Sequence, residues 1–296
     1  MIIDKIELLS TKILSQQHNL SKDLYEMNRN LALSAGWHYI LDWTWAVSQV
    51  GELDNKIILD AGAGIGLLQW YLARQGAHII SVDRSDRKCI PFHLVNLFNV
   101  GGLTDINKPL NLINMINVFN KTTSFSKRTK SLVRGAIGSL LSSNYASTTG
   151  SVKLYKQDLE NLVHIADNSV DLVISISALE HNKNINDIKK IVSELLRVLK
   201  KGGKMIITLP ASNHIDWFFE PAYSWCFTEA TIKAIFALPE ATPSNYDQYE
   251  TIFMEIKNSK DLKSNLSWRY YFSRNSGMPH GKWDPKYIPV GIVKTK

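Results

Sequence analysis

The chain of 296 residues contains little cysteine and no long hydrophobic segment, and each shortage excludes a class of protein. Two cysteines, Cys89 and Cys226, are too few for a disulfide framework or a cysteine-built zinc site. No apolar run approaches the roughly 18 residues that cross a bilayer. Acidic residues stand at Asp4 and Glu7, too early for a secretory signal peptide. We therefore expect a cytoplasmic protein.

Acidic residues are also scarce in one part of the chain. The composition, 45% hydrophobic and 21% charged, is that of a globular protein, and the net charge is +7. All of this excess lies in residues 84–151, where nine Lys and Arg residues are opposed only by Asp86 and Asp105. The basic balance therefore belongs to one segment, and it favours an acidic partner for that segment alone.

The first 50 residues carry a helical pattern. Apolar residues recur at three- and four-residue steps, first at Ile2, Ile6, Leu9 and Ile13, and then at Leu24, Met27 and Leu31. Residues 37–50 are rich in aromatic side chains, whose simplest explanation is core packing. The pattern predicts an N-terminal helical extension over residues 1–50.

From residue 51 onward, short apolar segments alternate with helical ones. Strands are predicted at residues 56–60, 77–83, 152–155, 170–175 and 204–209, with a last pair at 249–256 and 287–293 forming an edge hairpin. Helices are predicted at residues 67–75, 186–201 and 228–236. Gly76 ends the first helix and Gly202-Gly203 the second. The alternation predicts an α/β, doubly wound, mostly parallel seven-stranded sheet over residues 51–296, with an insertion at 84–151 between its second and third strands.

A glycine-rich turn joins the first of these strands to its helix. It reads Asp60-Ala61-Gly62-Ala63-Gly64-Ile65-Gly66. Glycines here let the main chain approach a ligand closely, at the sheet edge where doubly wound folds bind their ligands. The dinucleotide fingerprint requires a glycine at the sixth place from Gly62, where Leu67 stands instead. A nicotinamide-dependent oxidoreductase is therefore disfavoured, although it remains an alternative.

This D-x-G-x-G-x-G order resembles motif I of the class I S-adenosylmethionine-dependent methyltransferases. The segment from Asp171 to His181 and the Leu-Lys-Lys-Gly-Gly-Lys stretch at 199–204 are similar to the methyltransferase type 11 group, which includes ubiquinone and menaquinone biosynthesis enzymes. The resemblance covers about residues 57–236, apart from 84–151. It implies a Rossmann-like fold, S-adenosylmethionine as cofactor and methyl transfer as the reaction.

The resemblance also implies which residues hold the cofactor. Asp83 is placed at the ribose, where a carboxylate accepts hydrogen bonds from both hydroxyls. Arg84 follows over the adenine face, and Asp158 with Leu159 is expected at the adenine edge. The full set of implied cofactor residues is Asp60, Gly62, Gly64, Gly66, Asp83, Arg84, Asp158, Leu159 and Ser177. Asp83 and Asp158 have a structural alternative, because aspartates at these positions also cap turns.

An oxygen or acidic carbon acceptor requires a base, and His181 is the first candidate because histidine titrates near working pH. The alternative is that Glu180 and His181 only order the loop. His214 and Asp216 are further candidate bases on the substrate side. Tyr223 and Trp225 in the same loop either line the substrate pocket or serve aromatic packing within the protein. No Asn-Pro-Pro-Tyr motif and no metal-spaced cluster appear, so methylation of nucleic acid bases and metal-assisted chemistry are not supported.

The insertion at 84–151 has three interpretations. Residues 110–141 combine apolar and basic faces that suit peripheral contact with an anionic membrane. They also suit a lid that presents cations to an anionic acceptor, or an added helical layer on the core. Nucleic acid is disfavoured as a partner, because Phe125 is the only aromatic residue between Lys121 and Asn144.

The leading hypothesis is a methyltransferase that acts on oxygen or carbon of a small or lipid-linked metabolite. The main alternative is a non-enzymatic S-adenosylmethionine-binding module that residues 110–141 attach to a membrane surface.

Overall fold

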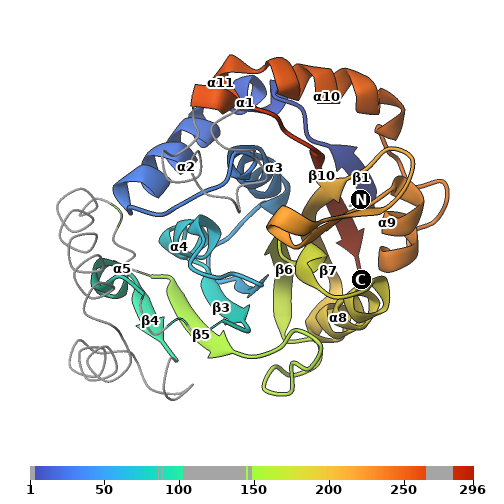
Figure 1. Ribbon diagram of the computed structural model, residues 1–296. Coiled ribbons are helices and arrows are strands. Elements are labelled where there is room, and N and C mark those ends of the chain that lie inside the picture. Colours follow the sequence, from blue (N-terminus) through green and yellow to red (C-terminus); the bar gives the residue numbers. More distant parts are fainter. Residues whose placement is uncertain (1–3, 86, 88–89, 103–144, 146–148, 265–282) are drawn as a thin grey trace.

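The computed structural model describes residues 4–85, 87, 90–102, 145, 149–264 and 283–296, and these ranges form a main sheet of eight strands flanked by helices (Figure 1). The strand order is β1-β10-β7-β6-β2-β3-β5-β4. The strands are β1 (Lys5–Leu8), β2 (Ile57–Ala61), β3 (His78–Asp83), β4 (Asn99–Gly101), β5 (Ser151–Lys156), β6 (Val170–Ile176), β7 (Leu199–Ala211) and β10 (Ile288–Thr295).

The six strands from β7 to β4 run parallel, and β10 and β1 continue the sheet antiparallel beyond β7. This arrangement confirms the predicted Rossmann-like, mostly parallel α/β fold, with one strand more in the main sheet than the seven expected. Because β3 lies on one side of β2 and β6 on the other, the chain reverses its direction of travel across the sheet at β2. Ligands bind at such switch points, outside the carboxyl ends of the strands.

Helices cover both faces of the sheet. The described helices are α1 (Lys12–Gln16), α2 (His18–Asn30), α3 (Tyr39–Val50), α4 (Leu67–Arg74), α5 (Phe92–Leu97), α8 (Ile185–Val198), α9 (Glu229–Phe236), α10 (Tyr249–Asn258) and α11 (Lys260–Ser264). Figure 1 shows α2, α3 and α4 on one side of the sheet and α8 and α9 on the other. A short ribbon of β8 (Trp217–Phe219) and β9 (Ser224–Cys226) follows β7.

Helix α3 packs on the antiparallel part of the sheet through Trp45. The indole is almost fully buried, and a β-carbon added at Gly291 of β10 would lie only 2.4 Å from its ring. Its Nε1 donates a hydrogen bond to Glu7 of β1 at 2.8 Å. Trp37 and Trp43 are buried as well. The prediction that the aromatic residues of 37–50 serve the core is confirmed for these three tryptophans. The packing of their rings attaches the first 50 residues to the sheet.

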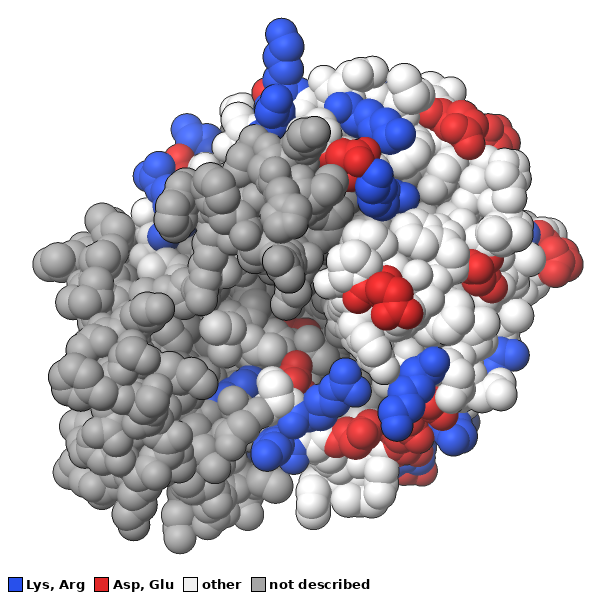
Figure 2. All heavy atoms as spheres, in the orientation of Figure 1, with Lys and Arg blue, Asp and Glu red and all other residues white. Residues whose placement is uncertain are grey.

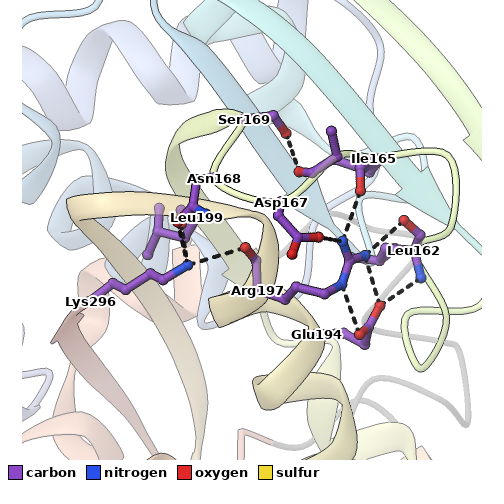
Figure 3. Close-up of polar contacts among 10 residues, drawn as sticks. Leu162, Ile165, Asp167, Asn168, Ser169, Glu194, Arg197, Leu199 and Lys296 are labelled. Carbon is purple, nitrogen blue, oxygen red and sulfur yellow. Dashed lines mark hydrogen bonds and ion pairs between the residues drawn. The ribbon is translucent and has the colours of Figure 1, made fainter.

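Arg197 near the end of α8 fastens the connection between β5 and β6 (Figure 3). Its guanidinium makes two hydrogen bonds to Glu194, both at 3.0 Å, and donates to the carbonyls of Leu162 at 3.0 Å and Ile165 at 3.1 Å. Glu194 in turn accepts a hydrogen bond from the Leu162 amide at 3.1 Å. The loop that leads from Asp158 to β6 is therefore held by one planar side chain with several donors.

Two segments differ from the secondary structure expected. Residues Lys5–Leu8 form strand β1 instead of part of a helix, because Ile6 and Leu8 alternate with half-exposed neighbours and pair with β10. Tyr249–Asn258 is helix α10, not a strand, since Tyr249, Ile252 and Ile256 are buried at helical spacing. The hairpin expected from residues 249–256 and 287–293 was therefore wrong, and β10 pairs with β7 and β1 instead.

The end of α8 also differs from the prediction. The helix stops at Val198, before the glycine pair, and Leu199 is already extended. Gly202, with φ +74°, lies within an irregular stretch of β7 where the register against β6 shifts. The glycine thus permits a β-bulge and not a helix cap.

On the face of the molecule that Figure 2 shows, Lys and Arg side chains lie next to Asp and Glu over the described residues. Residues 103–144, which hold most of the insertion, lie outside the described residues, so the three interpretations of that segment stay predictions. No helix in the described ranges is long and apolar enough to cross a membrane.

Candidate functional site

The glycine turn after β2 has the backbone geometry that only glycine adopts easily. Gly62 and Gly64 have φ values of +76° and +49°, and Gly66 precedes the first residue of α4. A β-carbon added at Gly62 would lie 2.4 Å from the Cβ of Ala178, which follows β6. The turn therefore fits closely against the end of the neighbouring strand and leaves main chain exposed toward the space above it.

Asp83 at the end of β3 holds this turn in place. One carboxylate oxygen accepts a hydrogen bond from the Gly64 amide at 2.8 Å, and the other accepts from the Ser85 amide at 2.7 Å. Burial alone would raise the pKa of Asp83, but these hydrogen bonds and the nearby Arg87 hold it below its ordinary value. Asp83 is therefore a carboxylate, which can accept a hydrogen bond from a ligand hydroxyl.

Arg87 is a residue that the sequence interpretation missed. It is only 5% exposed, and its guanidinium donates to the carbonyls of Ser81 at 2.8 Å and Tyr155 at 2.7 Å. It also reaches the Gly64 carbonyl at 3.3 Å. One cation thus joins β3, β5 and the glycine turn. The available sequence signal was a basic residue shortly after a strand that ends in an acid. Arg84 shows the same signal, yet it is exposed, so the signal alone does not distinguish the two arginines.

Asp60 is the buried acid at the root of the turn. Burial raises its pKa to about 7, against the positive charge of Arg87 and with the help of the negative charge of Asp83. The carboxyl group is 5% exposed and borders the space beside Gly62, Gly64 and Gly66. A cationic ligand group there would favour the ionised form.

Two adjoining cavities lie at the carboxyl ends of β2, β3, β5 and β6. The first has a volume of about 260 Å³, and the second has about 210 Å³. They share Tyr39, Gly62 and Ser177 in their walls. The first is lined among others by Asp83, Arg84, Asp158, Leu159 and His181, and the second by Asp60, Gly64, Gly66 and Trp43. The structure thus brings every residue of the predicted set to one cleft, while their individual roles stay predictions.

Asp158 combines two expected features. Its side chain faces the first cavity, and it also accepts a hydrogen bond from the Glu160 amide at 3.1 Å, as an aspartate in a turn does. One carboxylate can do both, since this hydrogen bond occupies only one of its oxygens. The bond fixes the side chain at the rim of the cavity.

His181 and Glu180 lie on a short 3-10 turn after β6. His181 Nδ1 lies 2.8 Å from the carbonyl oxygen of Tyr223, a geometry in which the ring nitrogen donates and the carbonyl accepts. In the neutral ring this leaves the lone pair on Nε2, which is 3.9 Å from Glu180 Oε1. Burial raises the pKa of Glu180, against the effects of His181 and of a hydrogen bond from Ser177.

The residues expected on the substrate side mostly support the fold. Asp216 accepts hydrogen bonds from the Thr228 amide at 2.7 Å and the Thr231 hydroxyl at 2.6 Å, so it holds the start of α9, and its role as a base stays a prediction. Tyr223 and Trp225 pack against Phe218, with ring centroids 5.0 and 5.3 Å apart. His214 is on the surface beside Asn213. No group of three potential metal-binding side chains occurs within the described ranges.

Comparison with known proteins gives one family match. The model described as "Methyltransferase domain" matches residues 137–207, which include β5, β6, α8 and the first part of β7. The matched range begins beyond the glycine turn and Asp83, so it leaves the roles of those residues open. A comparison with curated proteins found no matching sequence.

Several solved structures are similar to the chain at low identity. An S-adenosylmethionine dependent methyltransferase from Mesorhizobium loti is 13% identical, with 86% of this chain and 97% of that chain covered and a TM-score of 0.43. The cyclase SpnF is 13% identical, with coverage of 99% and 98% and a TM-score of 0.49. An N-methyltransferase from Haemonchus contortus, solved with phosphomonomethylethanolamine and S-adenosylhomocysteine, is 15% identical, with coverage of 96% and 59% and a TM-score of 0.47.

Proposed function

We propose that this chain is a class I S-adenosylmethionine-dependent methyltransferase that transfers the methyl group to oxygen or carbon of a small or lipid-linked acceptor. The methyltransferase-domain match over residues 137–207 supports the reaction class. The observation that supports the proposal best is the single cleft at the switch point of the sheet, with acids at the ends of β2 and β3 and bare main chain between them. The cytoplasm is the proposed compartment, and a membrane contact through residues 110–141 belongs to the same proposal.

The cleft suits the cofactor in shape and in charge. Asp83 would accept hydrogen bonds from the ribose hydroxyls, and Asp158 and Leu159 would meet the adenine edge at the far end of the first cavity. Arg84 borders the same cavity and would cover the adenine face. The second cavity, with Asp60 beneath the glycine turn, would take the methionyl part, whose ammonium group is a cation.

The bound cofactor supplies an electrophilic methyl group, and the protein supplies alignment and a proton acceptor. His181 would perform the second task. Its Nδ1 is engaged by the Tyr223 carbonyl, which orients the ring and leaves the Nε2 lone pair to accept the proton of an acceptor hydroxyl or carbon acid. Ser177 borders both cavities and would contact the cofactor near the reacting group.

Calorimetric titration with S-adenosylmethionine tests the binding site. Wild-type protein is expected to bind the cofactor, and Asp83→Ala is expected to weaken binding by roughly 10- to 100-fold, because a charge-assisted contact and the brace on Gly64 are both lost. Asp247→Ala is a matched control, since Asp247 is an exposed acid just before α10 that lines neither cavity. Equal affinity in wild type and Asp83→Ala would contradict the ribose assignment.

Radiolabelled cofactor incubated with a cell extract then tests the reaction. Label that passes to a fraction of the extract would support the transferase and allow the acceptor to be isolated. Binding without any transfer of label would favour the non-enzymatic binding module instead.

A further inference from the structure

The proposed function assigns a particular part of the cofactor to the point where the two cavities meet. They share three wall residues, Tyr39, Gly62 and Ser177. With the nucleoside beside Asp83 and the methionyl part beside Asp60, the sulfur that connects these halves lies where the cavities join. Tyr39 is the only aromatic residue that lines both cavities within the described part of the chain. Its ring therefore borders the sulfonium, and this step rests on the proposed function.

Several neighbours fix the ring of Tyr39. The His38 ring stacks on it at a centroid distance of 4.6 Å and an interplanar angle of 24°. His38 is itself fixed, because its Nδ1 lies 2.6 Å from Asp42 in a pair that is almost completely buried. A β-carbon added at Gly36 would stand 3.1 Å from two carbons of the Tyr39 ring. The ring is thus positioned before any ligand enters.

A fixed aromatic ring distinguishes two forms of the cofactor. S-adenosylmethionine carries a positive sulfur, which the negative face of an aromatic ring attracts, and the demethylated product carries a neutral thioether. The two ligands are otherwise alike in their nucleoside and methionyl parts. An aromatic wall at the sulfur therefore adds affinity for the first ligand only.

We propose that Tyr39, held by His38 and Asp42, recognises the positive charge of the sulfonium and makes the site prefer S-adenosylmethionine over S-adenosylhomocysteine. Tyr39 is a specificity-determining residue in this proposal. It comes from the N-terminal 50 residues, so that segment is part of the cofactor site. Loss of the methyl group removes the attraction and favours release of the product.

Trp43 supplies a matched control. It lies one turn further along α3, its ring centroid is 5.4 Å from that of Tyr39, and it lines the second cavity but not the first. The methionyl part that it would contact is common to both ligands. Removal of the Trp43 ring is expected to weaken both ligands by the same factor, in contrast to removal of the Tyr39 ring.

Isothermal titration calorimetry of wild type, Tyr39→Leu, Tyr39→Phe and Trp43→Leu with each ligand tests the proposal. Tyr39→Leu should lower the affinity for S-adenosylmethionine by roughly 3- to 30-fold and that for S-adenosylhomocysteine by less than about twofold. Tyr39→Phe should keep the wild-type ratio of the two affinities, because its ring retains the negative face. Circular dichroism establishes that each variant is folded.

The outcomes separate this proposal from the function on which it rests. If wild type binds neither ligand, the cofactor assignment itself fails. If wild type binds both and Tyr39→Leu weakens them equally, or changes neither, the ring serves packing and the proposal is overturned. A lost preference in Tyr39→Phe would also overturn it, since the hydroxyl and not the ring would then be responsible.

Discussion

At the scale of single residues, the cofactor cleft contains one acid whose ionised form destabilises the folded protein when no ligand is bound. Asp60 is buried, and its pKa is raised to about 7 from an ordinary 3.8. The stability that its neutral form contributes is complete below pH 4 and is lost as the pH rises through 7. Above pH 7 the folded protein holds a buried carboxylate, which is a cost that a cationic ligand would relieve.

Asp60→Asn is therefore expected to stabilise the protein and weaken the cofactor. The amide stays neutral, so the variant should gain on the order of a few kcal/mol of unfolding free energy over wild type above pH 7, and almost none near pH 4. Affinity for S-adenosylmethionine at pH 8 should fall about tenfold, because the ligand loses a counter-charge. Urea denaturation at several pH values measures the first effect, and calorimetry measures the second.

Asp247, an exposed acid that lines neither cavity, provides the control for this experiment. Asp247→Asn should match wild type in unfolding free energy and in cofactor affinity, because the substitution of an exposed side chain away from the cleft changes little. The same pH dependence in Asp60→Asn and in wild type would show that Asp60 is not the buried carboxylate responsible.

At the scale of elements, the cleft depends on how loops are attached to the sheet. Asp158 and Leu159 stand at the start of the connection that Arg197 and Glu194 fasten to α8 (Figure 3). The pKa of Arg197 is raised by its hydrogen bonds to Glu194 and Asp167, so the pair stays ionised throughout the working range. The connection is thus tied to the helix at Leu162 and Ile165, a few residues beyond the expected adenine contacts.

Arg197→Met is expected to loosen this connection. Methionine keeps much of the length of the side chain and removes all of its donors, so the loss should be about 1–3 kcal/mol of unfolding free energy, reduced by the partial exposure of the site. Cofactor affinity should fall severalfold, because ordering the loop then opposes binding. Urea denaturation and cofactor titration of the same preparation measure both effects.

Lys190→Met on the same helix is the matched comparison. Lys190 is exposed and makes two long ion pairs at 3.4 and 3.9 Å, and its loss should change stability by less than about 0.5 kcal/mol. An Arg197→Met variant as stable as Lys190→Met would mean that the hydrogen bonds around Arg197 do not fasten the loop.

At the scale of the whole molecule, the sequence predicts the parallel half of the sheet well and its antiparallel edge poorly. Strands β2 and β6 are largely buried apolar runs, and β3 and β5 mix buried residues with more exposed ones. Each is followed by an acid or a turn, so the pattern is local. Strand β1 is four residues long and is defined by its partner β10, almost 290 residues away, so no local pattern reveals it. Tyr249–Asn258 has both apolar and β-branched residues, and only its burial at helical spacing decides for a helix.

The same distinction applies to the cleft. The glycine turn and the acids that end two strands are local signals, and the sequence predicts them together with their place on the sheet. Arg87 and Tyr39 acquire their importance from contacts with distant elements, which explains why no local sequence pattern indicates a role for them at the site. Both sit where three parts of the chain converge, and such positions depend on tertiary packing.

Ligand binding at the switch point should be felt by the whole fold, because the cleft is built from four strands and from α3. A ligand that binds only the folded state at about 100 times its dissociation constant adds about 2.7 kcal/mol of stability. For a chain of this size, saturating S-adenosylhomocysteine should raise the melting temperature by several degrees. Differential scanning fluorimetry measures the shift, and Asp83→Ala at the same ligand concentration should reduce it strongly. An equal shift in both proteins would mean that S-adenosylhomocysteine binds away from the end of β3. That result would contradict the proposed position of the cofactor.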